Sequence, residues 1–189
     1  MQQLIIDLDH TLLDTTAFKL DLAKSLGLTS NEWADSYNRY VQDNNVFDAR
    51  DFLQGVDTSD QKKFYQVISQ ISKYLYPDST QFLKQTLKDG WEVLILTFGS
   101  ESWQEMKIDN MNFPNGVKTL AVSKEKISVV KNYVKEQTVF IDDRSIEIDA
   151  VKKSFPEIKA YWMRRENGKY RDIQPTLHDK IISNLNIEL

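Results

Sequence analysis

The sequence predicts an α/β protein with three layers, in which a mostly parallel sheet carries helices on both faces and a helical unit is inserted after the first strand. Two observations support this class. Short apolar segments alternate with amphipathic segments over residues 77–189, as they do in successive βαβ units. Residues 15–76, in contrast, have apolar side chains at helical spacing and no convincing strand. We therefore expect a core built from residues 1–14 and 77–189, with residues 15–76 as the insertion.

The first strand is expected immediately after the N-terminus. Leu4, Ile5 and Ile6 form an apolar run suited to a buried strand, and the run stops at Asp7 and Asp9. Residues two apart on an extended chain face the same side, and two close carboxylates repel each other unless a cation lies between them. Mg²⁺, which prefers oxygen ligands, would relieve that repulsion. The alternative is that both acids are ordinary turn residues at a strand end.

The inserted unit is expected to contain three main helices. Residues 15–16 are candidates to cap the first, and Gly27 ends it. Thr29 and Glu32 have the spacing of a capping box and open the second. The third helix is expected within residues 58–75. We interpret the aromatic side chains of these helices as core packing rather than as ligand contacts.

Four further strands are expected in the core, each followed or preceded by a helix, and the chain is expected to end in an amphipathic helix. The strands are predicted over residues 93–96, 117–122, 139–141 and 158–163. The terminal helix would carry Leu177, Ile181 and Leu185 on one face.

Polar residues follow three of the apolar strands. Thr97 follows the second, and Asp142 and Asp143 follow the fourth, while Lys124 and Lys126 lie at the start of the helix that precedes the acidic pair. The carboxyl ends of parallel strands meet at one edge of a sheet, where ligands bind in open α/β folds. The sequence therefore predicts that these groups gather around the acids of the first strand.

The same motifs, in the same order, resemble those of the haloacid dehalogenase (HAD) superfamily. They are a strand followed by Asp-x-Asp-x-Thr (Asp7 to Thr11), a strand-terminal Thr97, a helix-opening Lys126 or, as the alternative, Lys124, and the acidic pair Asp142 and Asp143. The resemblance spans residues 1–14 and 77–189. It implies a Rossmann-like core, with residues 15–76 as a small α-helical cap.

The resemblance implies that Asp7 is a nucleophile that attacks phosphorus and forms an aspartyl-phosphate. A carboxylate is ionised at neutral pH and needs no general base. Asp9 would protonate the leaving oxygen and then accept a proton from the hydrolytic water. Dehalogenases of the family lack this acid and the metal, so Asp9 points to a phosphatase or, less readily, a phosphomutase.

A cation is required because an anionic phosphate and a carboxylate ~4 Å apart repel by about 4 kcal/mol at an effective dielectric constant of ~20. The resemblance implies Mg²⁺ bound by Asp7, by the backbone carbonyl of Asp9 and by Asp143. Thr97 and Lys126 would bind the transferred phosphoryl group. The supporting residues would be Thr11 and Asp142.

Several conspicuous residues fall outside these motifs. His10 and His178 are the only histidines, and we interpret both as structural, with His178 in the terminal helix. Arg164 and Arg165 follow a strand and are expected to form a solvated edge. Arg144 is interpreted as the partner of a carboxylate.

The composition narrows the class of partner. A net charge of −4, from 24 basic and 28 acidic residues, argues weakly against a nucleic-acid partner, which needs a basic patch. The absence of cysteine excludes disulfides, thiolate metal sites and cysteine nucleophiles. There is no signal-peptide pattern and no apolar run long enough for a bilayer. We expect a cytoplasmic protein that acts on a small phosphorylated metabolite, such as a sugar phosphate or a nucleotide, and binds neither nucleic acid nor membrane.

Two other functions use similar residues. A receiver-like switch also has a phospho-accepting Asp, an acidic pair, a Thr and a Lys around Mg²⁺. In receivers, however, the acidic pair precedes the acceptor, whereas Asp142 and Asp143 follow Asp7 here. A catalytically silent HAD-like binding protein is the other alternative, and the intact motifs argue against it.

Overall fold

The computed structural model describes residues 1–189 and is built around one six-stranded sheet in which every pair of neighbouring strands is parallel. The strand order is β3-β2-β1-β4-β5-β6. The strands are β1 (Gln2–Ile6), β2 (Glu92–Phe98), β3 (Val117–Val122), β4 (Gln137–Asp142), β5 (Lys159–Met163) and β6 (Lys180–Ile182). Because β1 lies between β2 and β4, the residues that follow β1 are at the middle of the carboxyl edge of the sheet, where parallel sheets bind ligands.

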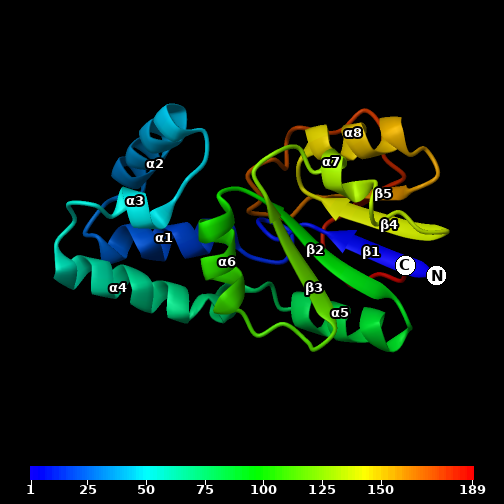
Figure 1. Cartoon of the computed structure of the whole chain (residues 1–189), viewed down its shortest axis with the longest axis horizontal. Helices are drawn as coiled ribbons and strands as arrows, with labels where there is room; N and C mark the ends of the chain where they lie inside the picture. The colour runs from blue at the N-terminus through cyan, green and yellow to red at the C-terminus, as the bar shows by residue number, and fades with distance from the viewer.

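Helices cover both faces of this sheet, which confirms the predicted three-layer α/β class. They are α5 (Ser79–Lys88) and α6 (Glu101–Asp109) on one side, and α7 (Ile127–Val130) and α8 (Ser145–Ser154) on the other (Figure 1). Alternate side chains of β1 enter two separate cores: Leu4 and Ile6 pack with α5 and α6, and Ile5 packs with α7 and α8. A strand that is buried on both faces reads as a continuous apolar run, as these residues do.

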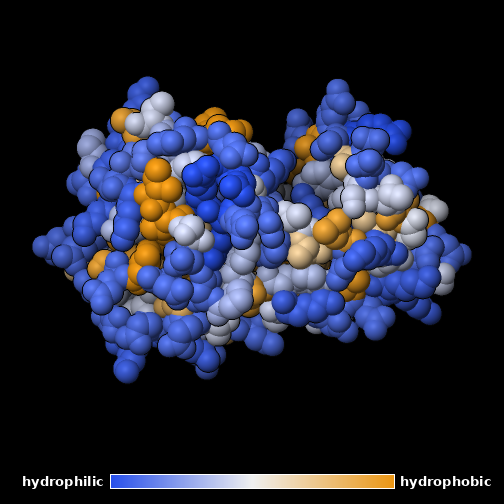
Figure 2. Space-filling view, turned by 180° about the vertical axis from the view of Figure 1, so that it is seen from behind, coloured by the Kyte–Doolittle hydropathy of each residue, from blue (hydrophilic) through white to orange (hydrophobic).

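The chain between β1 and β2 is helical. It forms α1 (Thr15–Ser25), α2 (Ser30–Asn44), α3 (Ala49–Phe52), α4 (Thr58–Ser69) and the 3₁₀ helix η1 (Ile71–Tyr74). Figure 1 shows α1 to α4 beside the sheet, on the side where β1 ends. In the space-filling view from behind, a notch in the outline separates these helices from the sheet, and the surface of both parts is mainly hydrophilic (Figure 2).

The ends of these helices are fixed by side-chain caps. Thr29 and Glu32 form the predicted capping box at the start of α2. The cap of α1 is Asp14 rather than residues 15–16, because the Asp14 carboxylate accepts a hydrogen bond from the Ala17 amide at 2.9 Å. Asp57 caps α4 in the same way, through the Ser59 amide at 2.7 Å. Each cap satisfies an amide that the helix itself leaves unpaired.

Aromatic rings hold the helical insertion together and join it to α6. Trp103 of α6 stacks on Phe18 of α1, with ring centroids 6.2 Å apart, and meets Phe47 edge-on at 5.3 Å. Trp33 of α2 packs against Phe47 and Phe52 at 6.0 and 5.4 Å. Such pairs add to the burial of apolar area that stabilises the unit.

The prediction of a helix at the end of the chain is wrong. Residues 180–182 form the short edge strand β6 instead, and the Asp179 carboxylate accepts a hydrogen bond from the Ala160 amide at 2.7 Å, which brings the segment to β5. Leu177 and Ile181, expected on a buried helical face, are exposed, whereas Ile182 and Leu185 are buried. A three-residue strand is too short to produce a recognisable period in the sequence. No helix of the chain is both long enough and apolar enough to cross a membrane.

Candidate active site

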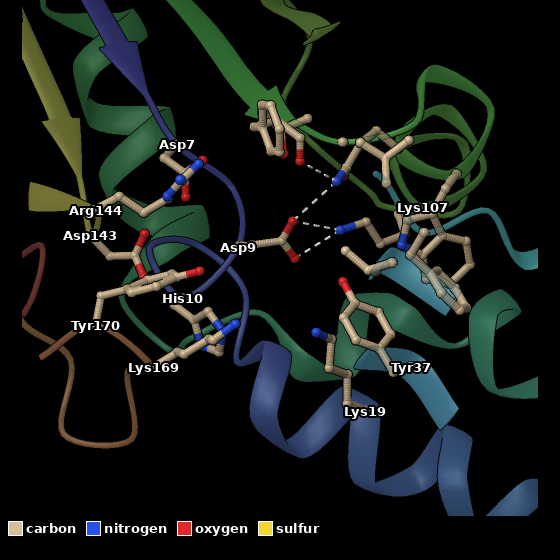
Figure 3. Close-up of a pocket in the computed structure, with 18 of the residues that line it drawn as sticks. Asp7, Asp9, His10, Lys19, Tyr37, Lys107, Asp143, Arg144, Lys169 and Tyr170 are labelled. Atoms are coloured by element: carbon tan, nitrogen blue, oxygen red, sulfur yellow. Dashed lines mark hydrogen bonds and ion pairs between the residues drawn. The ribbon is translucent and has the colours of Figure 1, made fainter. Parts of the chain in front are cut away.

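A cavity of about 250 Å³ lies at the carboxyl edge of the sheet, between the strand ends and the helical insertion. Asp7 and Asp9, from the loop after β1, line it together with Thr97 of β2, Lys126 and Asp143. Figure 3 shows Asp9 in the middle of the cavity, with Asp7 and Asp143 on one side of it. The structure therefore brings residues from four distant segments of the chain to one place.

Three carboxylates meet at the bottom of this cavity. Asp7, Asp142 and Asp143 each offer one oxygen, and these oxygens all lie within 4.8 Å of one another, although the three residues are at most 5% exposed. Burial raises the pKa of Asp7 to about 7; the ion pair with Lys126 opposes this shift, and the charges of Asp142 and Asp9 add to it. Burial, followed by the charges of Asp7 and Asp142, raises the pKa of Asp143 to about 9. At the bottom of the cavity, the charge of Lys126 therefore does not offset the burial of Asp7 and Asp143.

The hydrogen bonds distinguish Asp142 from the other two acids. Both Asp142 oxygens have partners: Oδ2 accepts from Lys126 Nζ at 2.7 Å, and Oδ1 accepts from the Arg144 amide at 2.8 Å. Oδ2 of Asp7 and Oδ2 of Asp143 are buried without any hydrogen-bond partner. Buried, unpartnered carboxylate oxygens are suitable ligands for a hard divalent cation, so Asp7 and Asp143 fit a metal site.

Lys126 is the lysine that enters the cavity, while Lys124 is exposed. Lys126 is 1% exposed, immediately precedes α7, and forms ion pairs with both Asp7 and Asp142. Burial works to lower the pKa of this ammonium, but the two carboxylates outweigh burial and raise it above its ordinary value. Lys126 is therefore a fixed positive charge beside Asp7.

The two threonines of the motifs occupy different positions. Thr97 is fully buried near the end of β2, lines the cavity, and has a hydroxyl without a hydrogen-bond partner. A free donor of this kind suits an oxygen of a bound anion. The Thr11 hydroxyl is also buried and unpartnered, but Thr11 does not line the cavity.

Asp9 is held by Lys107 of α6. The Lys107 ammonium donates to the two Asp9 oxygens at 2.8 and 2.7 Å, and the Thr15 hydroxyl donates to Oδ1 at 2.8 Å. Burial works to raise the pKa of Asp9, but the charge and the hydrogen bonds of Lys107 hold that pKa well below its usual range. Asp9 is consequently ionised in the free protein.

The histidines differ in environment. His10 is 6% exposed and lines the cavity, and burial lowers the pKa of its imidazole to about 4, so the ring is neutral. Its backbone lies in the left-handed region, with φ of 60°, and this conformation turns the chain between Asp9 and Thr11. His178 lies outside the cavity and not in a helix.

No protein-family model matches this sequence, and neither does any curated protein. Solved structures do match. A haloacid dehalogenase-like hydrolase from Burkholderia xenovorans superposes with a TM-score of 0.68 at 18% identity, over 98% of this chain and 94% of that chain. The L-2-haloacid dehalogenase PA0810 superposes with a TM-score of 0.65 at 14% identity, over 98% of this chain and 96% of that chain. The magnesium-bound HAD-hydrolase YfnB from Bacillus subtilis superposes with a TM-score of 0.61 at 14% identity, over 97% of this chain and 95% of that chain. The chain has the HAD-like hydrolase fold.

The HAD-like fold confirms, at the level of architecture, the resemblance seen in the sequence. Its structural neighbours include dehalogenases and a phosphoserine phosphohydrolase-like protein from Francisella tularensis, which has a TM-score of 0.58 at 16% identity over 98% of this chain and 96% of that chain. A fold shared by such different hydrolases does not determine which reaction a protein catalyses. The reaction depends on the side chains of the site.

Sequence reasoning missed Lys107, although a signal was present. Trp103 and Lys107 are four residues apart and therefore share a face of α6, and Trp103 is buried on that face. A lysine on the buried face of a helix needs an acidic partner, because a lone buried charge is costly. The sequence does not identify that partner as Asp9, which lies 98 residues away.

The prediction that Arg164 and Arg165 form a solvated edge is wrong for Arg165, which is 5% exposed. Its guanidinium pairs with both oxygens of Asp78, at 2.6 and 2.8 Å, and donates to the Thr11 carbonyl at 3.1 and 2.9 Å. It also lies 4.1 Å from the ring centroid of Tyr76. These contacts satisfy a buried arginine, because its planar fork matches a carboxylate.

Proposed function

We propose that this protein is a Mg²⁺-dependent phosphatase that hydrolyses a small phosphorylated metabolite through an aspartyl-phosphate on Asp7. The observation that carries the proposal is the cluster at the bottom of the cavity, where Asp7 lies beside a buried lysine and two further carboxylates. Residues 1–14 and 77–189 would act as the catalytic core, and residues 15–76 as a cap over the cavity.

The proposed metal ligands are Asp7, Asp143 and the backbone carbonyl of Asp9. The unpartnered oxygens of Asp7 and Asp143 support this choice, and the two hydrogen-bonded oxygens of Asp142 favour a supporting role for that residue. When bound, Mg²⁺ would neutralise the carboxylates and lower the electrostatic barrier to an incoming phosphate.

In the first step, an oxygen of Asp7 attacks phosphorus, so that the Asp7–phosphorus bond forms while the bond to the leaving oxygen breaks. Lys126 and the Thr97 hydroxyl would hold the oxygens of the transferred group, because both reach the cavity and Thr97 has a hydrogen bond to give. Donors fixed before the reaction stabilise charge without reorganising during it.

Asp9 would move the protons. Its ionised form, maintained by Lys107, accepts a proton when water hydrolyses the aspartyl-phosphate and releases Asp7. For the first step, Asp9 must carry a proton to the leaving oxygen. A nearby anionic substrate raises the pKa of a carboxylate and competes for the Lys107 ammonium, so substrate entry favours that protonation.

Turnover of an aryl phosphate tests the proposal. We expect hydrolysis that depends on Mg²⁺, is removed by a chelator and restored by added Mg²⁺, and falls by on the order of 10⁴-fold or more in Asp7→Asn. A parallel assay for halide release from a 2-haloacid tests dehalogenation. Halide release without phosphate release would overturn the proposal, a stable phosphoprotein without turnover would favour the switch, and inactivity in both assays would favour a binding protein.

A further inference from the structure

The cavity contains more positive charge than its acids neutralise. Among its lining residues, Lys107 is paired with Asp9, and Lys126 is paired with Asp7. Lys19 of α1 and Lys169 of the loop after β5 also line the cavity, yet neither forms an ion pair or a side-chain hydrogen bond. Two lysines without counter-ions therefore remain at the wall of the cavity.

Lys19 is held in position despite this lack of a counter-ion. Its ammonium lies 4.0 Å from the centroid of the Tyr37 ring, which comes from α2. Burial lowers the pKa of Lys19 to about 8, and although Asp9 attracts it, the like charges of Lys169 and Lys107 add to the lowering. An ammonium that is poorly hydrated and close to other ammonium groups gains stability from a bound anion.

His10 adds a polar group to the same wall. Its ring is buried at 6% exposure, lines the cavity, and has an Nδ1 atom without a hydrogen-bond partner. The ring is close enough to Lys19 and Lys169 to respond to their charges. Buried polar atoms are nearly always hydrogen-bonded, so an unpartnered nitrogen in a residue that lines a cavity suits a ligand.

Part of this wall lies apart from the place where phosphorus would react. Figure 3 shows Asp7 and Asp143 on one side of Asp9, Lys19 and Tyr37 pointing into the cavity from the other side, and His10 and Lys169 below Asp9, between these two groups. A phosphoryl group on Asp7 would use Lys126 and Thr97, which leaves Lys19, Lys169 and His10 for another part of the substrate. A volume of about 250 Å³ limits that substrate to a small molecule.

We propose that Lys19, Lys169 and His10 bind a second anionic group of the substrate, so that the substrate class is a small phosphate ester with a terminal carboxylate or second phosphate. This inference rests on the proposed phosphatase function for the identity of the first group. Lys19 reaches the anion from the helical insertion and Lys169 from the core, so the second anion also joins the two parts of the molecule.

Binding of stable phosphonates tests the inference without relying on turnover. Three ligands of similar length are titrated into the protein in Mg²⁺ buffer by calorimetry: propylphosphonate, phosphonopropionate and propane bisphosphonate. We expect the two ligands with a terminal anion to bind on the order of 10- to 100-fold more tightly than propylphosphonate, as charge-assisted hydrogen bonds imply. The tighter of the two identifies the second group as carboxylate or phosphate.

Four variants assign this preference to residues. Lys19→Met and Lys169→Met should each reduce the affinity ratio severalfold or more, whereas Lys19→Arg, which keeps the charge, should retain most of it. Lys63→Met is the matched control, because Lys63 is an exposed lysine of α4 that pairs with Asp60 and does not line the cavity. Equal binding of the three ligands, or a preference that survives both methionine variants, would overturn the inference.

The corresponding phosphate esters separate this inference from the proposed function. If the wild-type protein binds the terminal anion preferentially but hydrolyses none of the esters, the anion subsite stands and the phosphatase fails. If it hydrolyses all three esters with equal kcat/KM and binds the phosphonates equally, the phosphatase stands and the subsite fails.

Discussion

The sheet and the helical insertion are stabilised in different ways. Every strand of the sheet pairs with segments distant in the sequence, and the middle of the sheet is packed with aliphatic side chains on both faces. In the insertion, α2 has 15 residues but only Trp33 is buried, and Trp33 packs against the rings of Phe47 and Phe52. Regions with few buried contacts open at lower free-energy cost.

This difference matches a division of tasks at the site. The candidate reacting groups Asp7, Thr97 and Asp143 are at strand ends, where the sheet fixes their positions. Lys19 and Tyr37, which line the same cavity, come from α1 and α2 of the insertion. Chemistry needs fixed geometry, whereas admission of a substrate needs a part that opens.

Replacement of Lys126 should have the largest effect. In Lys126→Met, two buried carboxylates lose their counter-charge, so we expect a loss of about 3–5 kcal/mol in the free energy of unfolding and of at least about 10³-fold in turnover. Denaturant titration and aryl phosphate kinetics measure the two losses. The exposed Lys124→Met is the control and should be near wild type; equal effects in both variants would contradict the assignment.

Core truncations in the two regions should differ in extent. Phe140→Ala in β4 should reduce global stability by about 3–5 kcal/mol and accelerate hydrogen exchange throughout the sheet. Trp33→Ala should mainly accelerate exchange in α2 and α3 while the strands remain protected. If Trp33→Ala exposed the strands as strongly as Phe140→Ala, the two regions would be one cooperative unit.

The pH dependence of kcat/KM should identify the contribution of Lys19. Its pKa is lowered to about 8 in the free protein, mainly by burial, so the ammonium is charged below this pH and loses its proton above it. For a substrate with a second anion, kcat/KM should therefore fall with rising pH, by about tenfold at pH ~9. In Lys19→Arg this alkaline limb should disappear, because arginine stays charged; a limb unchanged by the substitution would assign it to another group.

Loss of the α2 cap should have the smallest effect. Thr29→Ala removes one side of the capping box and should reduce the free energy of unfolding by about 1 kcal/mol or less, with faster exchange confined to the first turn of α2. Ser30→Ala, one residue later, makes no side-chain hydrogen bond and serves as the control. A change in turnover of the aryl phosphate by Thr29→Ala would show that this helix end is linked to the reacting groups.

The sequence predicted what depends on local pattern. The apolar runs identified five of the six strands, and the polar residues that end β1, β2 and β4 do converge in space. The local pattern does not predict contacts between distant residues. Neither the pairing of Lys107 with Asp9 nor that of Arg165 with Asp78 follows from the spacing of residues in the sequence. The edge strand β6 was missed because tertiary pairing, rather than periodicity, determines so short an element.

The Arg165 guanidinium connects the far end of the chain to its beginning. It holds the carbonyl of Thr11, while its partner Asp78 also accepts a hydrogen bond from the Leu185 amide at 2.9 Å. The loop that carries Asp7 and Asp9 is thus anchored by a side chain 154 residues further along the chain. The position of this loop therefore depends on the folding of the segment after β5 as well as on the strands beside β1.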